Sequence, residues 1–126
     1  MLGEVFNERA FLALEKGLGA LALRHRVIAD NIANANTPGF KKSEVSFARE
    51  LARFLERAGR GSGPAPAFRP RVFTVTGTSQ RLDGNNVDIE EEMAKLAENT
   101  LLYEATARQL SAHLVRLRLA VSEGRR

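Results

Sequence analysis

The sequence predicts a mainly α protein, in which an elongated antiparallel pair of long N- and C-terminal coiled-coil-type helices is joined by a flexible middle segment with little β structure. Near both ends of the chain, apolar residues recur at alternating spacings of three and four, which is the repeat of coiled-coil helices. The region between them is rich in glycine, proline and arginine. We therefore expect an N-terminal axial helix in residues 1–40, a middle region in residues 41–82 and a C-terminal axial helix in residues 83–126.

The N-terminal helix is predicted from one stripe of mostly apolar residues. Its positions are Phe11, Leu14, Leu18, Leu21, His25, Ile28, Ile32 and Ala35. A repeat of about 3.5 residues keeps such a stripe narrow and on one face, so at least one other helix must cover it. We expect an assembly seam here, formed by Leu14, Leu18, Leu21 and Ile28.

The C-terminal helix carries a longer seam with the same repeat. Its positions are Ile89, Met93, Leu96, Thr100, Tyr103, Ala107, Leu110, Leu114, Leu117 and Val121. A second stripe beside it consists of Ala94, Leu101, Ala105, Ala112, Val115 and Leu119. Two apolar stripes on one helix require more than one neighbour. We expect one stripe to pair with the N-terminal helix and the unused one to contact other copies of the chain.

The start of the C-terminal helix is specified by its polar residues. The segment Asp83–Asn86 is predicted as a turn, and Asp88 followed by Glu91 resembles an N-cap with a capping-box carboxylate. Three consecutive acids, Glu90, Glu91 and Glu92, point in different directions around a helix. We expect them to be solvated and to complement the positive end of the helix dipole.

The middle region gives weaker signals. Residues Ser43–Ala58 are predicted to form a short helix, and Gly59–Pro70 has the composition of a linker. Residues Arg71–Thr76 alternate like one short strand, but a lone strand is not independently stable. We therefore expect residues 59–82 to be mobile in an isolated subunit.

Composition disfavours several classes of function. The chain lacks the roughly 18 consecutive uncharged apolar residues that membrane insertion requires, and acidic residues near its start disfavour a cleaved secretory signal. The net charge is +4, and residues 41–82 hold nine basic and three acidic side chains. Because aromatic residues are not interleaved with these basic ones, we favour a solvated linker over a nucleic-acid surface.

No catalytic, metal or cofactor site is predicted. The chain has no cysteine, and neither His25 nor His113 has a histidine or acidic neighbour three or four positions away, as a helical metal pair would require. An enzyme is therefore disfavoured, and association with other proteins is the expected role. A helical nucleic-acid-binding module and a helical chaperone or adaptor remain the alternatives from other classes.

The end of the first helix is unusually polar. The stretch NIANANTPGFKK, residues 31–42, contains three asparagines and then Pro38 and Gly39. The residue before a proline is pushed away from helical angles, and the Pro-Gly pair suits the centre of a type II turn. By itself this stretch predicts a helix terminator, with Phe40 directed back onto the helix or onto a partner.

The same stretch resembles the motif shared by flagellar rod, hook and hook-associated axial proteins. The matching residues are Asn31, Ile32, Ala33, Asn34, Thr37, Pro38, Gly39 and Phe40. Residues 82–110, LDGNNVDIEEEMAKLAENTLLYEATARQL, are similar to the corresponding segment of the FlgB family of proximal rod proteins. Rod proteins of the FlgC type, which share the first motif, are the second choice.

The resemblance implies a structural, non-enzymatic subunit of the bacterial flagellum basal body that needs no cofactor. Such a subunit is exported without a cleaved signal peptide and polymerises helically into the periplasmic rod that transmits torque. The implied partners are other copies of the chain, other flagellar rod proteins, the basal-body base adaptor and the flagellar type III export apparatus, with no nucleic acid and no direct membrane insertion. Asn31 and Asn34 are expected to tie adjacent helices together, within one subunit or between subunits.

Overall fold

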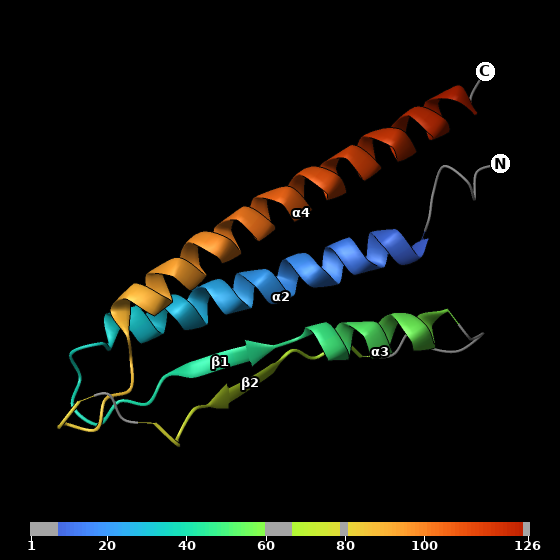
Figure 1. The fold of residues 1–126 in the computed structure, drawn as a ribbon. Coiled ribbons are helices and arrows are strands. Elements are labelled where there is room, and N and C mark those ends of the chain that lie inside the picture. Colours follow the sequence, from blue (N-terminus) through green and yellow to red (C-terminus); the bar gives the residue numbers. More distant parts are fainter. Residues whose placement is uncertain (1–7, 60–66, 79–80, 125–126) are drawn as a thin grey trace.

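A computed structural model describes residues 8–59, 67–78 and 81–124. Its elements follow in the order α2 (Glu8–Ala33), β1 (Ser43–Ser46), α3 (Ala48–Ala58), β2 (Arg71–Thr74) and α4 (Ile89–Glu123). The two long helices run antiparallel along the length of the molecule (Figure 1). With 35 residues, α4 extends over about 50 Å at about 1.5 Å per residue. The predicted fold class, a mainly helical pair of long terminal helices joined by a middle segment, is confirmed.

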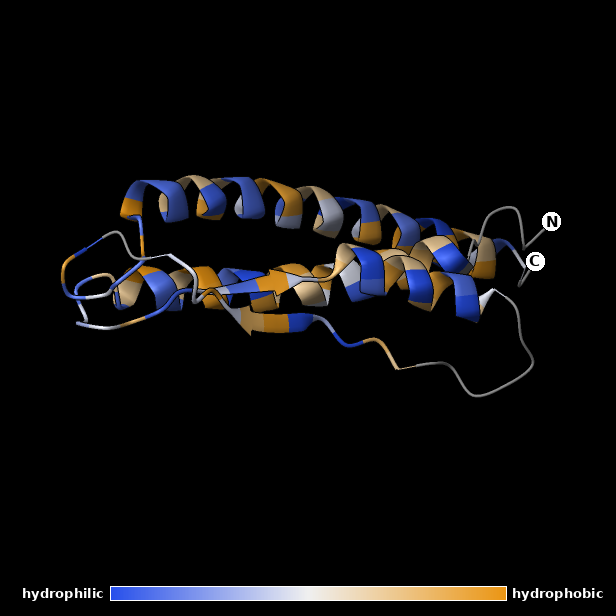
Figure 2. Ribbon diagram, turned by 60° about the horizontal axis from the view of Figure 1, so that its bottom comes forward, coloured by the Kyte–Doolittle hydropathy of each residue, from blue (hydrophilic) through white to orange (hydrophobic). Residues whose placement is uncertain are grey.

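Helix α2 is the central element. It contacts α4 as well as β1 and α3, and it lies between α4 and the layer that the hairpin and α3 form (Figures 1 and 2). The buried apolar residues follow this arrangement, since four of the six belong to α2 or the turn after it: Ala20, Leu21, Ile28 and Ala35. The core is therefore a narrow line along α2.

The middle region forms a small antiparallel sheet. Ser43 pairs with Thr74 and Ser46 with Arg71, and the N–H of Val75 donates to the carbonyl oxygen of Lys42 at 2.9 Å. The prediction of a helix from residue 43 is therefore wrong for residues 43–47, of which 43–46 form β1, although α3 follows in residues 48–58 as expected. Val45 is the only apolar residue of the segment SEVS, so these four residues carry no helical apolar repeat of their own.

The pairing also changes the expectation for residues 59–82. The predicted strand forms in residues 71–74 and is not alone, because β1 provides its partner. Residues before it are anchored as well, since the ring of Phe68 packs edge-to-face on buried Phe54 of α3, with 5.8 Å between ring centroids. Residues 60–66 and 79–80, on which the expectation of mobility also rests, lie outside the described residues.

Helix α4 begins with the predicted N-cap residue, Asp88, but the expected capping-box contact of Glu91 is replaced by ion pairs. The side chain of Asp88 accepts hydrogen bonds from the backbone N–H groups of Glu90 and Glu91, at 3.0 and 3.3 Å. These are two of the four N–H groups that lack a partner at a helix start. The carboxylate of Glu91 turns to Lys95, one helical turn further on, at 2.7 Å.

Candidate assembly interface

Helix α2 ends in a tight turn that redirects the chain. The N–H of Phe40 donates to the carbonyl oxygen of Thr37 at 3.2 Å, and Gly39 has a φ of 74°. A type II turn requires a positive φ at its third residue, which glycine adopts without strain. The predicted turn at Pro38-Gly39 is therefore confirmed.

A second turn, just before α4, packs against the first. The N–H of Gly39 donates to the carbonyl oxygen of Asp83 at 2.9 Å, and the N–H of Asn86 donates to that of Phe40 at 3.4 Å. Gly84 also has a positive φ, 84°, and a Cβ added at this position would lie 3.7 Å from the Cα of Gly39. We call these two turns, residues 34–42 and 81–87, the joint, because they tie the end of α2 to the start of α4.

Asn85 binds the backbone of the first turn. Its side chain is fully buried, and its amide nitrogen donates to three carbonyl oxygens at 2.8–3.0 Å, those of Asn34, Ala35 and Thr37. Its oxygen accepts the N–H of Val87 at 2.8 Å. All three carbonyl groups lie in the first turn, just after the end of α2 at Ala33, so one side chain from the second turn satisfies backbone acceptors of the first.

Asn31 connects three elements from within α2. Its amide nitrogen donates to the carbonyl oxygen of Ser43 at 2.8 Å and to Glu92 Oε2 at 3.1 Å, while its oxygen accepts the N–H of Ser43 at 3.0 Å. The side chain thus pairs with the edge of β1 as a neighbouring strand would. Both Asn31 and Glu92 are only 1% exposed, so the contact holds α2, β1 and α4 together in one chain.

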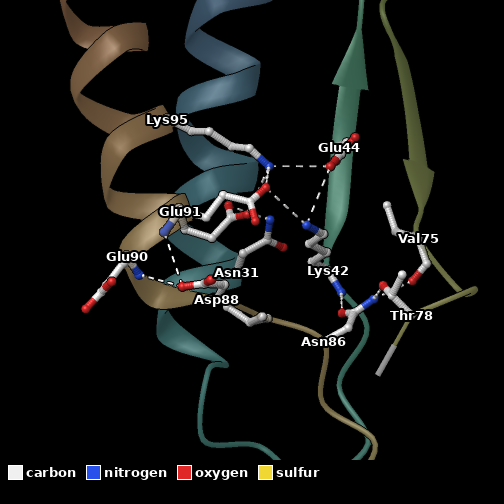
Figure 3. Close-up of polar contacts among 12 residues, drawn as sticks. Asn31, Lys42, Glu44, Val75, Thr78, Asn86, Asp88, Glu90, Glu91 and Lys95 are labelled. Carbon is white, nitrogen blue, oxygen red and sulfur yellow. Dashed lines mark hydrogen bonds and ion pairs between the residues drawn. The ribbon is translucent and has the colours of Figure 1, made fainter. Parts of the chain in front are cut away.

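Asn86 has a comparable role below the hairpin (Figure 3). Its oxygen accepts the N–H of Lys42 at 2.7 Å, and its nitrogen donates to the carbonyl oxygen of Val75 at 2.8 Å. The side chain therefore bridges the residues that precede β1 and follow β2. This fixes the hairpin against the joint.

Asn99 lies further along α4 and faces the middle of α2. Its amide nitrogen donates to the carbonyl oxygen of Leu21 at 2.9 Å, and the residue is 1% exposed. Its side-chain oxygen is buried with no hydrogen-bond partner in the described part of the chain. A buried amide of this kind fixes the alignment of two helices at some cost in stability.

A network of charged side chains lies close to Asn31 (Figure 3) and consists of Lys42, Glu44, Glu91 and Lys95. Lys95 lies 2.7 Å from Glu91 and 3.5 Å from both Glu92 and Glu44, and Lys42 lies 3.5 Å from Glu91. The hydrogen bond and positive charge of Lys95, with that of Lys42, hold the pKa of Glu91 below its usual value of 4.5. Burial works against a charged Lys95, but its hydrogen bond to Glu91 and the surrounding carboxylates together raise the pKa of Lys95 above 10.5.

The face of α4 that contacts α2 is a row of polar and small residues at every seventh position. We call it the inward row: Glu92, Asn99, Thr106, His113 and Ala120, all buried or half-buried. Three of its members meet α2 directly, Glu92 at Asn31, Asn99 at Leu21 and His113 at the ring of Phe11, with 6.2 Å between centroids. The in-chain contact of α4 is therefore largely polar.

The predicted seam of α4 lies beside the inward row. Leu96, Leu110 and Leu117 are half-buried. The outer members are exposed, namely Ile89, Met93, Tyr103, Leu114 and Val121, with 39–52% of their surface accessible. Of the predicted seam in α2, Leu21 and Ile28 are buried and Leu14 and Leu18 are half-buried. Within one chain, α2 therefore buries its seam, whereas α4 leaves part of its seam open.

The motif residues divide in the same way. Asn31 is buried at the contact with Glu92, whereas Asn34 bonds locally, its amide donating to the carbonyl oxygen of Asp30 at 2.9 Å. Ile32 and Phe40 are half-buried, and Ala33, Thr37, Pro38 and Gly39 are exposed. The turn therefore presents its Thr-Pro-Gly segment at the surface.

Sequence reasoning missed five buried polar residues, namely Lys42, Asn85, Asn86, Glu92 and Asn99. The expectation that all three acids of residues 90–92 are solvated is wrong for Glu92, which Asn31 and Lys95 bind in a buried position. Hydropathy patterns treat a buried carboxylate as a surface residue. The available signal was the seven-residue interval between Glu92 and Asn99, which places both on one face of a helix.

Neither a metal site nor a membrane-spanning helix is found in the described residues. They contain no group of three or more His, Cys, Asp or Glu residues placed to hold a metal ion. None of the helices they form is both long and apolar enough to cross a membrane. His25 is exposed, and His113 lies in the inward row on the same α2–α4 pair.

The helix pair, the Asn-rich joint and the exposed seam suit a subunit of a larger assembly, and comparison with known proteins places the chain among the flagellar rod proteins. Residues 11–41, which are most of α2 and the first turn of the joint, match the family described as flagella basal body rod protein. The chain is 41% identical over 102 residues to the flagellar basal body rod protein FlgB of Borrelia hermsii, an alignment covering 68% of this chain and 76% of that protein.

Two further relatives cover more of both chains. FlgB of Bacillus subtilis is 30% identical over 122 residues, which span 89% of this chain and 92% of that protein. FlgB of Escherichia coli is 30% identical over 115 residues, or 79% and 83% of the two chains. The chain belongs to the FlgB family of flagellar basal body rod proteins.

Proposed function

We propose that this chain polymerises helically through its terminal helices into the proximal part of the flagellar rod and there transmits torque. One observation carries the proposal: the polar inward row occupies the contact between α4 and α2, and much of the apolar seam of α4 stays exposed. Exposed apolar side chains that line one helix favour burial against another protein.

The arrangement supports assembly in several directions. A groove of about 400 Å³ between α2 and α4 is lined by Ala22, His25, Thr100, Tyr103 and Glu104, and it opens beside the exposed seam. Contacts between unlike surfaces of identical subunits do not close on themselves and generate helical filaments. Many long helices packed side by side distribute a twisting load over a large interface.

The partners and the route follow from the proposal. The relatives are named as flagellar basal body rod proteins, so the neighbours of this chain in a rod are other copies and other rod proteins, with the base adaptor below. We infer a periplasmic location, reached through the flagellar type III export apparatus without a cleaved signal peptide. The role is structural, and no catalytic step is required of the chain.

Replacing Leu114 by Asp tests the exposed seam. Leu114 is 47% exposed in the single chain, so Leu114→Asp lowers its free energy of unfolding by only about 1 kcal/mol, from lost helix propensity and partial loss of apolar burial. In a strain that lacks the native gene, this variant is expected to be produced but absent from isolated basal bodies, and the cells do not swim. Normal swimming would contradict the proposal.

Two control variants separate assembly from folding. Gln109→Asp adds the same charge at an exposed polar position of α4 and is expected to leave both folding and motility intact. Ile28→Asp instead places a charge at a residue that is 4% exposed, which costs about 3 kcal/mol or more. Ile28→Asp therefore abolishes motility by unfolding the subunit, which circular dichroism distinguishes from the effect of Leu114→Asp.

A further inference from the structure

The side of α4 that faces away from α2 has a stripe of its own. We call it the outer stripe: Ala94, Leu101, Ala105, Ala112, Val115 and Leu119. Its larger members are the most exposed apolar residues of the helix, with Leu101 69%, Leu119 58% and Val115 53% accessible. In Figure 2, hydrophobic and hydrophilic segments alternate along the free side of α4.

Charges along this free side are separated by sign. The exposed acids Glu90, Glu98 and Glu104 lie in the first half of α4. The exposed bases Arg108, Arg116 and Arg118 lie in its second half, where Glu123, at the end of the helix, is the only exposed acid. The ion pair of Glu104 with Arg108, at 3.9 Å, involves side chains that are 54% and 82% exposed. Most of this charge is therefore available to a neighbouring molecule.

The separation of charge decides how two copies can lie side by side. If two parallel α4 helices pack in register, acids face acids and arginines face arginines, which is repulsive. The midpoints of residues 90–104 and 108–118 are 16 residues apart, which corresponds to about 24 Å along a helix. A displacement of that size brings opposite charges together along the whole contact.

We propose that a second copy of the chain packs its α4 parallel to this helix, beside the outer stripe and displaced by about 24 Å along the axis. The acidic half of one copy then lies beside the basic half of the next, and the small and large residues of the outer stripes are covered. This inference rests on the proposed function, because an antiparallel pair would also match charges but would close as a dimer.

Cross-linking of introduced cysteines measures the displacement, since the chain has no cysteine of its own. Leu101 and Leu119 are 18 residues apart on the same side of α4, so about 27 Å separates them within a chain. A short bismaleimide that spans the about 8–10 Å between packed helices cannot join them in one subunit. Across two copies displaced as proposed, they lie at nearly the same height.

The chain carrying both Leu101→Cys and Leu119→Cys is expected to give a ladder of dimers, trimers and higher species in isolated basal bodies. The two single-cysteine chains are the matched controls, and each is expected to give no cross-linked product. Cross-linking of the Leu101→Cys chain alone would show packing in register and overturn the proposal. Dimers without higher species from the double variant would show the antiparallel pair and overturn it as well.

Charge reversal tests the cause. Replacing Glu98 and Glu104 by Lys, or Arg116 and Arg118 by Glu, makes both halves of α4 alike in sign. When either chain is produced alone, its amount in basal bodies is expected to fall roughly tenfold. The reason is that several surface ion pairs, each of modest strength, are lost together. The chain with all four replacements, and the two half-reversed chains produced together, restore opposite signs and recover incorporation.

The outcomes distinguish this inference from the proposed function. If both half-reversed chains enter basal bodies and support swimming as the unchanged chain does, the charge-matched displacement is wrong while the rod role stands. If the unchanged chain is absent from basal bodies, the rod role itself is wrong. If the fourfold variant folds normally by circular dichroism but does not recover incorporation into basal bodies, the proposed displacement is also wrong.

Discussion

Replacing Asn31 by Asp tests the buried contact that joins the two long helices. The substitution keeps the shape of the side chain but exchanges the amide nitrogen for an oxygen. That nitrogen donates to the carbonyl oxygen of Ser43 at 2.8 Å and to Glu92 Oε2 at 3.1 Å. In the Asn31→Asp chain, two carboxylates would therefore meet at about 3 Å in a site that water does not reach.

The size of the stability loss is set by whichever of two states of the variant has the lower free energy, both carboxylates charged or one of them protonated. Two negative charges 3.1 Å apart repel by about 5 kcal/mol at an effective dielectric constant of 20. Keeping one carboxyl protonated at pH 7, about three units above an ordinary aspartate pKa, costs about 4 kcal/mol. The pair therefore shares a proton, and we expect Asn31→Asp to lower the free energy of unfolding by about 4 kcal/mol at pH 7.

The sign of the pH dependence is distinctive. The pKa of the buried carboxyl pair is raised in the folded variant. The loss of unfolding free energy is therefore complete above that pKa and shrinks as the pH falls toward the pKa of aspartate in the unfolded chain. At pH 5 the cost of the shared proton is only about 1.5 kcal/mol. Urea unfolding followed by circular dichroism at pH 7 and pH 5 therefore gives different losses for the same substitution.

A second substitution and a control complete the test. Adding Glu92→Gln to Asn31→Asp restores a pair of one amide donor and one carboxylate. We therefore expect the double variant to recover most of the unfolding free energy lost at pH 7. The coupling energy between the two substitutions is expected to be about 2 kcal/mol or more. Asn36→Asp, at an exposed position near Arg81, changes stability by about 0.5 kcal/mol or less. A loss for Asn31→Asp below about 1 kcal/mol, or equal at both pH values, would refute the Asn31–Glu92 contact.

Two further predictions concern the turn and the charged network. Gly39→Ala, at a φ of 74°, is expected to lower the free energy of unfolding by about 1–2 kcal/mol. Gly19→Ala, in a helix with open space around it, is expected to raise it by about 1 kcal/mol. Equal shifts of the thermal melting temperature for the two variants would contradict this. The contribution of the Glu91–Lys95 pair is lost as the pH falls below 4.5 through the lowered pKa of Glu91, and as it rises above 10.5 through the raised pKa of Lys95. Lys95→Met should flatten both limbs of the stability profile.

Local rules predict the parts of this fold that short segments determine. The three- and four-residue spacing predicts both long helices, Asp88 marks the start of α4, and Pro38-Gly39 predicts the turn. Each depends on neighbours within a few residues, so it can be derived without knowing the rest of the chain.

Long-range polar contacts could not be predicted in the same way. The strand at residues 43–46 is specified by Asn31 and by pairing with residues 71–74, both distant in sequence, so its four residues were wrongly assigned to the following helix. Glu92 and Asn85 are buried only because partners 61 and 51 residues away, Asn31 and Asn34, complete their hydrogen bonds. No periodicity rule describes such pairs.

The polar inward row gives a physical reason why one side of α4 contacts α2 and the apolar surfaces beside it are left for assembly. Packing apolar side chains tolerates changes in alignment, whereas a buried amide or carboxylate must meet its one matched partner or lose its hydrogen bonds. Glu92 at Asn31 and Asn99 at Leu21 therefore fix how the two helices of one chain align. The less selective apolar surfaces, at Leu114 and in the outer stripe, are left for the contacts that build the rod, where charge along α4 sets the displacement.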